Sequence, residues 1–245
     1  LEENRRRLMN AEKLATVGKL AAGVAHEIRN PLTAVKMWLF SIRKAVGHEP
    51  DLDRKCEVIS EEIARLERIV CNFLEFSRPP APKLEAQSVS LLIDKTLELF
   101  GHRIEEKKLS LVRSGAEQVL SVRADGEQLK QVFVNVLDNA VDATAERGEI
   151  RIVVDAVGGA GDRSMVVVRI QDTGRGMPQD VCERIFQPFY TTKDDGTGLG
   201  LCIAAQIMAR HDGRLVLESS TERGTTFSVW IPTVRRESDE QNPGS

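Results

Sequence analysis

The features missing from this 245-residue chain exclude several common classes of protein. The sequence has no apolar run long enough to span a membrane and no apolar core of a secretory signal, which predicts a cytoplasmic segment without membrane contact. A formal net charge of −3 offers no basic surface for nucleic acid. Aromatic residues make up 4% of the chain, which suits a helical bundle joined to an aliphatic α/β core. The four cysteines follow no metal-binding or redox spacing, which predicts reduced packing residues. They are Cys56, Cys71, Cys182 and Cys202.

Two glycine-rich turns, DTGRG at residues 172–176 and GTGLG at residues 196–200, are the most informative features of the second half. Glycine lets backbone amides approach an anion closely, and the second turn opens an apolar helical pattern whose N-terminus has free N–H groups for phosphate. The first turn follows the apolar run MVVVRI, and Asp172 stands where that strand should end. One acceptor and one phosphate cradle predict a nucleotide held at both ends.

Residues 125–147 carry the pattern of an amphipathic helix, with Asp125 as its predicted N-cap. Asn135 and Asn139 are four residues apart and therefore share one face of this helix. Two amide oxygens one turn apart can hold Mg²⁺ beside phosphates. Two ordinary surface asparagines are the alternative, but asparagine is a mediocre helix former, which weakens that interpretation.

The N-terminal third has the periodicity of a helical bundle. Apolar or small residues recur at positions 14, 17, 21, 24, 28, 32, 35, 39, 42 and 46, and a second stripe follows at 56, 59, 63, 66, 70 and 73. If Leu14 is heptad position a, His26 falls at the exposed position f, where an ordinary surface histidine would also fit. Residues 1–77 are thus predicted to form a helical hairpin, residues 78–88 a proline-rich linker, and two hairpins a four-helix bundle in a homodimer.

These motifs, taken in order, resemble the conserved boxes of sensor histidine kinases. TVGKLAAGVAHEIRNPLTAV is similar to the H box, while NVLDNAVDA, DTGRGMP, ERIFQPFYTTK and GTGLGL are similar to the N, G1, F and G2 boxes. With GTTF at residues 224–227, the resemblance of the second half spans residues 89–234. The NAVDA and FYTTK forms resemble the nitrogen-regulation-type branch of these kinases.

The resemblance implies an all-α helical hairpin followed by an α/β sandwich of the Bergerat ATP-binding type. The ATP-binding domain would occupy residues 89–234, with one mixed sheet covered by helices on one face, and residues 235–245 would form a disordered tail. Helices are expected near 90–107, 125–147 and 198–211. Strands are expected near 109–113, 119–123, 149–157, 164–171, 214–219 and 225–232, with VGGAGD as a hairpin tip.

The resemblance also implies a phosphoryl transfer with a role for each residue of the H box. His26 would take the γ-phosphate of ATP with Glu27 as its acid–base partner, and an aspartate in the receiver domain of a response regulator would then receive it. Asn30 lies one turn beyond His26 and could orient a water molecule, so a phosphatase activity toward the regulator can coexist with the kinase.

In the second half, the resemblance assigns residues to ATP and Mg²⁺. Asp172 would accept a hydrogen bond from the adenine amino group, with Thr226 assisting, and Asn139 would bind Mg²⁺ with support from Asn135. The other residues expected at the nucleotide belong to the glycine turns and the start of the next helix. They are Gly174, Gly176, Gly196, Thr197, Gly198, Leu199, Gly200 and Leu201.

One position departs from the pattern of the family. Many of these kinases carry a basic residue three positions after the metal-binding asparagine, where this chain has Asp142. Another cation must therefore meet the phosphates, and Lys193, in a predicted lid over residues 180–195, is the candidate.

Two competing functions have different requirements. An ATPase that drives a conformational clamp needs a glutamate four residues before the metal-binding asparagine, and Asn135 at that position cannot act as the base. A non-catalytic scaffold would not need every box. The chain opens on the charged helical pattern LEENRRRLMNAEK, which predicts an upstream sensor domain absent from this segment.

Overall fold

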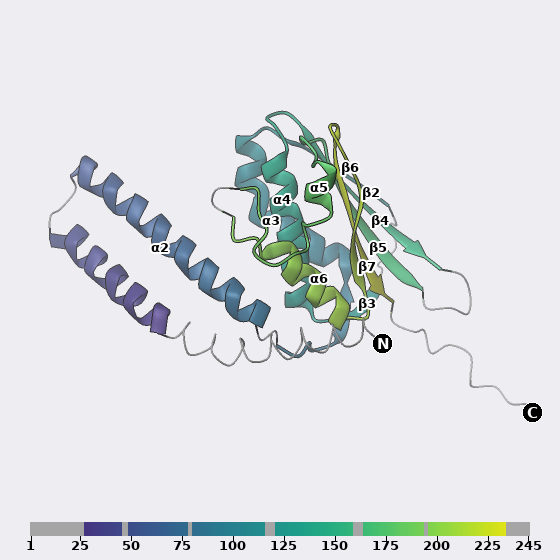
Figure 1. The fold of residues 1–245 in the computed structure, drawn as a ribbon, viewed down its shortest axis with the longest axis horizontal. Helices are drawn as coiled ribbons and strands as arrows, with labels where there is room; N and C mark the ends of the chain where they lie inside the picture. The colour runs from purple at the N-terminus through teal and green to yellow at the C-terminus, as the bar shows by residue number, and fades with distance from the viewer. Residues whose placement is uncertain are drawn as a thin grey trace, which may run out of the picture. The chain divides into compact units, whose positions relative to one another are not determined.

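The computed structural model describes residues 27–45, 49–77, 80–115, 121–158, 164–193 and 196–233. The chain divides into two compact units, Leu1–Pro80 and Ala81–Ser245, each of which is described by itself (Figure 1). Several predictions lie outside the described residues. They concern His26 and the N-terminal part of the first stripe, its last position at 46, the centre of the VGGAGD tip and the tail 235–245.

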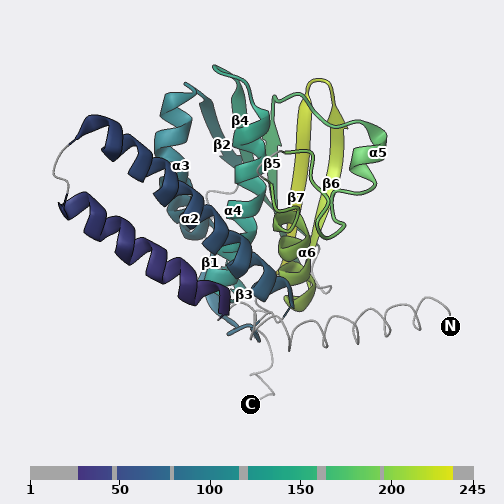
Figure 2. The same ribbon diagram turned by 60° about the vertical axis from the view of Figure 1, so that its left-hand side comes forward.

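The first unit is a helical hairpin, as predicted for the part that is described. A helix at residues 27–45 is followed by α2, Pro50–Ser77 (Figures 1 and 2). Lys36 pairs with Glu67 at 2.6 Å, whereas Arg43, further along the first helix, pairs with Asp53, nearer the start of α2, at 3.5 Å. The two helices are therefore antiparallel. Among the described residues, no helix is long and apolar enough to cross a membrane.

The apolar stripes of the hairpin are only partly buried. Leu39, Cys56, Ile63 and Val70 are buried, at 2–9% exposure. Between them, other members of the same stripes remain about half exposed, at 40–45%. They are Ile28, Val35, Ile42, Ile59 and Leu66. The described residues of one chain therefore leave an apolar strip uncovered along this unit.

The second unit is built on a five-stranded mixed sheet, ordered β2-β4-β5-β7-β6. Only β2 and β4 are parallel, and the other neighbours are antiparallel. Three helices cover one face of the sheet, as predicted (Figure 1). The strands are β2 Ser110–Gly115, β4 Glu149–Val157, β5 Met165–Asp172, β6 Arg214–Thr221 and β7 Gly224–Pro232, and the helices are α3 Val89–Glu106, α4 Gly126–Ala143 and α6 Gly200–Arg210.

The core of the second unit lies between this sheet and its helices. Alternate residues of β4, β5 and β7 are at most 5% exposed, because side chains alternate across a strand and one face meets the helices. The predicted stripe of α4 is at most 4% exposed. These buried residues are Ile150, Ile152, Val154, Val166, Val168, Ile170, Phe227, Val229 and Ile231 of the strands, and Leu129, Val132, Phe133, Val136, Leu137 and Ala140 of α4.

Helix α4 begins at its predicted cap and ends earlier than predicted. The side chain of Asp125 accepts hydrogen bonds from the amides of Glu127 and Gln128, both at 3.1 Å. At the other end, Thr144 takes an extended backbone conformation instead of continuing the helix to residue 147. The ammonium of Lys107 donates to the carbonyls of Val141 at 2.7 Å and Thr144 at 3.1 Å, which satisfies acceptors left by the helix end.

Two strands form a second, smaller sheet that was not predicted. β1, Glu85–Ser88, pairs antiparallel with β3, Ser121–Ala124. Residues 85–88 were predicted as part of the proline-rich linker, and the strand exists through its pairing with β3. The strand predicted at 119–123 consequently belongs to this small sheet and not to the main one. A short helix, α5 at Gln179–Cys182, overlaps the start of the predicted lid.

Candidate nucleotide-binding site

Asp172 ends β5 as a buried carboxylate, 4% exposed. Its Oδ1 accepts hydrogen bonds from the amides of Gly174 at 2.8 Å and Thr225 at 3.2 Å. Within the described part of the chain, Oδ2 takes part in no hydrogen bond. Burial raises the pKa of Asp172, and the two amides oppose that rise. The arrangement fixes one oxygen and leaves the other as an acceptor.

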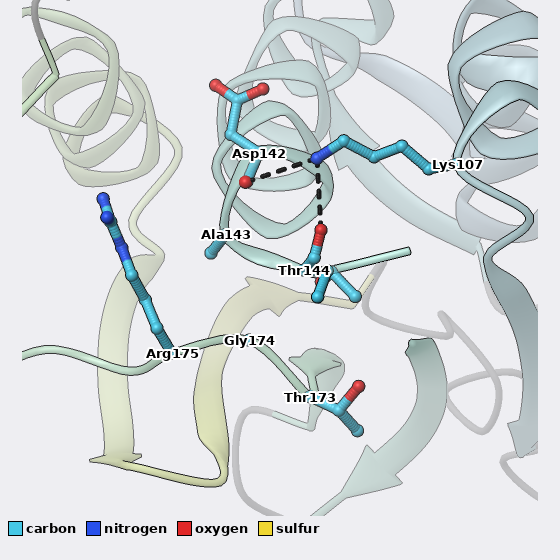
Figure 3. Close-up of a pocket in the computed structure, with 8 residues that line it drawn as sticks. Lys107, Asp142, Ala143, Thr144, Thr173, Gly174 and Arg175 are labelled. Atoms are coloured by element: carbon cyan, nitrogen blue, oxygen red, sulfur yellow. Dashed lines mark hydrogen bonds between the residues drawn. The ribbon is translucent and has the colours of Figure 1, made fainter. Parts of the chain in front are cut away.

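A cavity of about 600 Å³ is lined in part by Thr173 and Gly174, the residues that follow Asp172 in sequence. It opens between the end of α4 and the DTGRG turn (Figure 3). Lys107, residues 142–145 and residues 173–175 line it. Figure 3 shows the ammonium of Lys107 directed at the backbone oxygens of Asp142 and Thr144, so this cation caps the C-terminal end of α4. The volume is within the range of small-molecule sites.

The glycines of both turns are required by the backbone. Gly176 has φ of 63°, and a Cβ there would collide with the carbonyl oxygen of Thr221. Gly198 has φ of 66°, and a Cβ would lie 2.5 Å from the carbonyl carbon of Phe189. The amide of Phe189 donates to the carbonyl of Gly198 at 3.0 Å. The predicted lid is therefore tied by its backbone to the second turn.

The two asparagines of α4 lie near the start of α6. Asn139 donates its side-chain amide to the carbonyl of Asn135 at 2.9 Å, which leaves its Oδ1 as an available oxygen. The Nδ2 of Asn135 is buried and has no partner among the described residues. Its Oδ1 lies 3.3 Å from the position that a Cβ on Gly200 would occupy. An unpaired buried donor in this position fits a polar ligand between α4 and α6.

Among the described residues, no side chain caps the N-terminus of α6. Its N-cap residue is the buried Leu199, whose own amide donates to Thr197 Oγ1 at 3.3 Å. Within the described ranges, no capping side chain accepts a hydrogen bond from the first-turn amides of α6, from Gly200 and Leu201 onward. Free amides at a helix start bind phosphate, so this end of the site fits the phosphates of a nucleotide.

The two phenylalanines of the predicted lid differ in their surroundings. Phe186 packs edge-on against Phe227 of β7, with ring centroids 6.5 Å apart. Phe189 is 59% exposed and has φ of 64°, which is uncommon for a residue other than glycine. One ring is thus packed on the unit while the other is in contact with solvent.

Lys193 contacts acids of α4. Its ammonium donates to Asp142 Oδ2 at 2.6 Å and lies 3.8 Å from Asp138 Oδ2. Arg103 of α3 binds the same two acids. The predicted phosphate cation therefore already has carboxylate partners, and these long-range pairs could not be found from local spacing.

The structure replaces one predicted residue beside Asp172. Thr226 pairs in register with Gln171, so its side chain lies on the sheet face opposite to that of Asp172. Thr225 is the residue whose amide binds Asp172, and it is 5% exposed. A shift of one residue along a strand changes the face, and the sequence alone does not establish the register.

The residues of the predicted phosphoacceptor site are in the other unit. Glu27 and Asn30 are exposed on the helix at 27–45.

The cysteines are free thiols, and burial raises the pKa of Cys202 to about 11. Cys71 is exposed, so it is not the packing residue that was predicted. Among the described residues, no group of histidine, cysteine and acidic side chains could hold a metal ion.

Comparisons with known proteins match both units. Residues 16–82 match the His Kinase A (phospho-acceptor) domain, and residues 124–235 match the histidine kinase-, DNA gyrase B-, and HSP90-like ATPase domain. The chain is 34% identical over 240 residues to Sporulation kinase E of Bacillus subtilis, covering 98% of the chain and 32% of that protein. It spans about a third to a half of the first curated relatives it matches.

Solved structures agree with these matches. The catalytic domain of histidine kinase ThkA is 32% identical, with a TM-score of 0.56, covering 62% of this chain and 96% of that one. ThkA in complex with the response regulator protein TrrA is also 32% identical, with a TM-score of 0.66, covering 95% of this chain and 66% of that one. The two matched domains place the chain in the class of proteins that join a phospho-acceptor domain to an ATPase-type domain. The chain belongs to the sensor histidine kinase family, and its ATPase-type domain implies ATP binding.

Proposed function

We propose that this chain transfers the γ-phosphoryl group of ATP to His26 and then to an aspartate of a response regulator. The observation that supports this proposal is that the candidate site has two chemically complementary ends. Asn135 offers a buried unpaired amide beside the uncapped start of α6, and Asp172 offers an unpaired carboxylate oxygen at the end of β5. The first end suits phosphates and the second suits the amino group of adenine.

The remaining site residues follow from this orientation. The amides of the turn at 196–200 would surround the phosphates, and Thr225 would support Asp172 at the base. Asn139, with Asn135, would hold Mg²⁺, because its Oδ1 is available and amide oxygens suit this ion. Bound Mg²⁺ would supply positive charge to the phosphates.

The transfer exchanges one phosphorus bond for another. A neutral ring nitrogen of His26 attacks the γ-phosphorus, the bond to the bridging oxygen breaks, and ADP leaves. Glu27, exposed beside His26 in sequence, would take the proton from the other ring nitrogen. The protein mainly positions the reactants and stabilises charge.

The nitrogen-regulation-type branch is proposed from the NAVDA and FYTTK motifs.

The decisive experiment is to incubate the chain with ATP labelled at the γ-phosphate and to follow the label. A phosphohistidine is lost in acid and survives alkali. Label on the protein with this stability supports the kinase. Release of inorganic phosphate without labelled protein would favour the ATPase clamp, and ATP binding with neither product would favour the scaffold.

The uncovered strip of the hairpin supports a homodimer. Ile28, Val35, Ile42, Ile59 and Leu66 are 40–45% exposed and occupy positions expected to face a second hairpin in a four-helix bundle. Sedimentation over a range of concentrations should show a monomer–dimer equilibrium. A monomer at every concentration would contradict the dimer.

A phosphatase activity toward the regulator is a second proposal, which rests on the exposure of Asn30 one turn from His26. Asn30→Ala should retain autophosphorylation but slow the loss of phosphate from purified phosphorylated regulator. Ser41→Ala is a suitable control, since Ser41 is exposed three turns further along the same helix and its hydroxyl donates only to the carbonyl of Met37. Equal decay with Asn30→Ala and the wild type would rule out the phosphatase role.

A further inference from the structure

Four charged side chains from three segments form an ion cluster beside the asparagines of α4. Arg103 of α3 donates to Asp138 Oδ1 at 2.7 Å and also binds Asp142 Oδ1. Lys193 donates to Asp142 Oδ2 at 2.6 Å and lies 3.8 Å from Asp138 Oδ2. Two acids thus share two cations, and the cluster as a whole has no formal net charge.

The acids of this cluster are unfavourable in α4 by itself. Asp138 and Asp142 are four residues apart, where like charges on a helix repel each other. Both lie near the C-terminal end of α4, where the helix dipole also disfavours negative charge. The cations from α3 and from the segment before α6 therefore compensate a local cost. Such local conflicts are expected at functional sites.

The cluster borders the phosphate end of the proposed site. Asp138 directly precedes Asn139 in α4, and Asp142 follows Asn139 by three residues. The backbone of Lys193 is joined to the second glycine turn, because its carbonyl accepts from the amide of Gly196 at 3.2 Å. Its amide donates to Thr191 Oγ1 at 3.1 Å. Lys193 thus connects the acids of α4 to the turn that precedes α6.

The pairs of the cluster are weak enough to be exchanged. All four side chains are 34–46% exposed, so water screens their attraction. Pairs of this kind typically shift an equilibrium by less than about fivefold. A phosphate group offers several charged acceptor oxygens to an ammonium and is a stronger competitor than one solvated carboxylate.

We propose that Asp142, assisted by Asp138, holds Lys193 when no nucleotide is present, so that ATP must displace a carboxylate from this ammonium in order to bind. Asp142 thereby lowers the affinity for ATP. Arg103 limits this effect, because it neutralises the acids that would otherwise repel the phosphates. The inference rests on the proposed nucleotide site.

The test is calorimetry of Mg²⁺-ATP binding to the whole chain at low salt. Asp142→Asn should tighten ATP binding about fivefold, a gain and not the loss expected for a ligand-contacting residue. Asp138→Asn should have a smaller effect in the same direction, since its oxygen is further from Lys193. Arg103→Gln should weaken binding. In a Lys193→Ala background, Asp142→Asn should lose most of its effect.

Asp94→Asn is the matched control. Asp94 is a half-exposed acid paired with Arg113 of β2, so this variant makes the same charge change away from the cluster. It should leave ATP binding unchanged within about twofold. If the wild type fails to bind ATP, the proposed function is wrong. If the wild type binds ATP and Asp142→Asn binds equally or more weakly, Asp142 does not restrain Lys193. Circular dichroism of each variant establishes that it is folded.

Discussion

The α/β unit buries its apolar side chains far more completely than the helical hairpin does. Val132 and Phe133 of α4 are 0% exposed, whereas Ile59 and Leu66 of α2 are 44% and 40% exposed. The sheet and its three helices cover one another within one chain. In the described part of the hairpin, two helices pack against each other, and two helices alone cannot enclose an apolar strip. The difference indicates that the second unit is complete as a fold and that the hairpin requires a further surface.

The sharpest separation of the two units is expected from His26→Gln. The proposed acceptor and the proposed nucleotide site are in different units, so this change should abolish labelling by γ-labelled ATP and leave Mg²⁺-ATP affinity unchanged. Labelling and calorimetry on the same preparation measure both properties. Labelled protein in the variant would show that another residue accepts the phosphate.

The largest effect on stability is expected in the core of the second unit. Phe133→Ala removes a ring that is 0% exposed and should destabilise this unit by about 3–5 kcal/mol. Hydrogen exchange in peptides from α4 and β5 measures the change. Leu99→Ala, at a side chain 59% exposed on α3, should cost less than about 0.5 kcal/mol. Similar exchange in both variants would contradict the distinction between core and surface.

A smaller effect is expected from Asp172→Asn. The change can turn a donor toward the adenine amino group, and an unpaired buried polar group costs about 1–3 kcal/mol. ATP affinity should therefore fall about tenfold to a hundredfold. Calorimetry measures it, and Asp155→Asn on β4 is a control at a partly exposed acid. Unchanged affinity would remove Asp172 from the site.

In the hairpin, Leu66→Ala should weaken dimer association more than it lowers the folding stability of the hairpin. About 40% of this side chain is left exposed by one chain, so covering it in a dimer is worth about 1 kcal/mol per copy. Sedimentation equilibrium measures the dissociation constant. Val58→Ala lies outside the stripe at 60% exposure and should change little. Equal shifts in both variants would argue against the stripe as the interface.

The smallest effect concerns acid stability. Burial would raise the pKa of Asp125, but hydrogen bonds from the amides of Lys83, Gln128 and Glu127 lower it overall. The stabilisation is therefore complete above the ordinary pKa of aspartate, about 4, and is lost as the pH falls through the lower folded value. Asp125→Asn keeps a good N-cap and should reduce this acid dependence in denaturation between about pH 2 and 5. An unchanged pH profile would exclude Asp125 as its source.

Sequence patterns predicted those structural features that are determined by residues close to one another along the chain. The stripe of α4 and the Asp125 cap follow from spacing within one helix. The strand β1 was not predicted, because its polar residues form a strand only through pairing with β3. The face of Thr225 depends on the register of β7 against β5.

The charges around the candidate site were the least predictable part. Lys193 and Asp142 are 51 positions apart in sequence, and Arg103 reaches the same acid from α3. Lys107 closes the end of α4 in a similar way, through backbone oxygens that have no signature in the sequence. The motifs indicated the asparagines and glycines, but the ion pairs around them depend on how α3, α4 and the segment before α6 pack together.

The unpaired amide of Asn135 has a consequence for engineering. A buried donor without a partner makes the ligand-free protein less stable by about 1–3 kcal/mol, so an apolar residue of similar size would be favoured there on stability alone. Selection of variants for heat resistance without nucleotide would therefore tend to erase this position. Selection in the presence of nucleotide would retain it, because a bound ligand stabilises the native state by mass action. The choice of selection conditions thus decides whether a more heat-stable variant keeps this residue of the proposed nucleotide site.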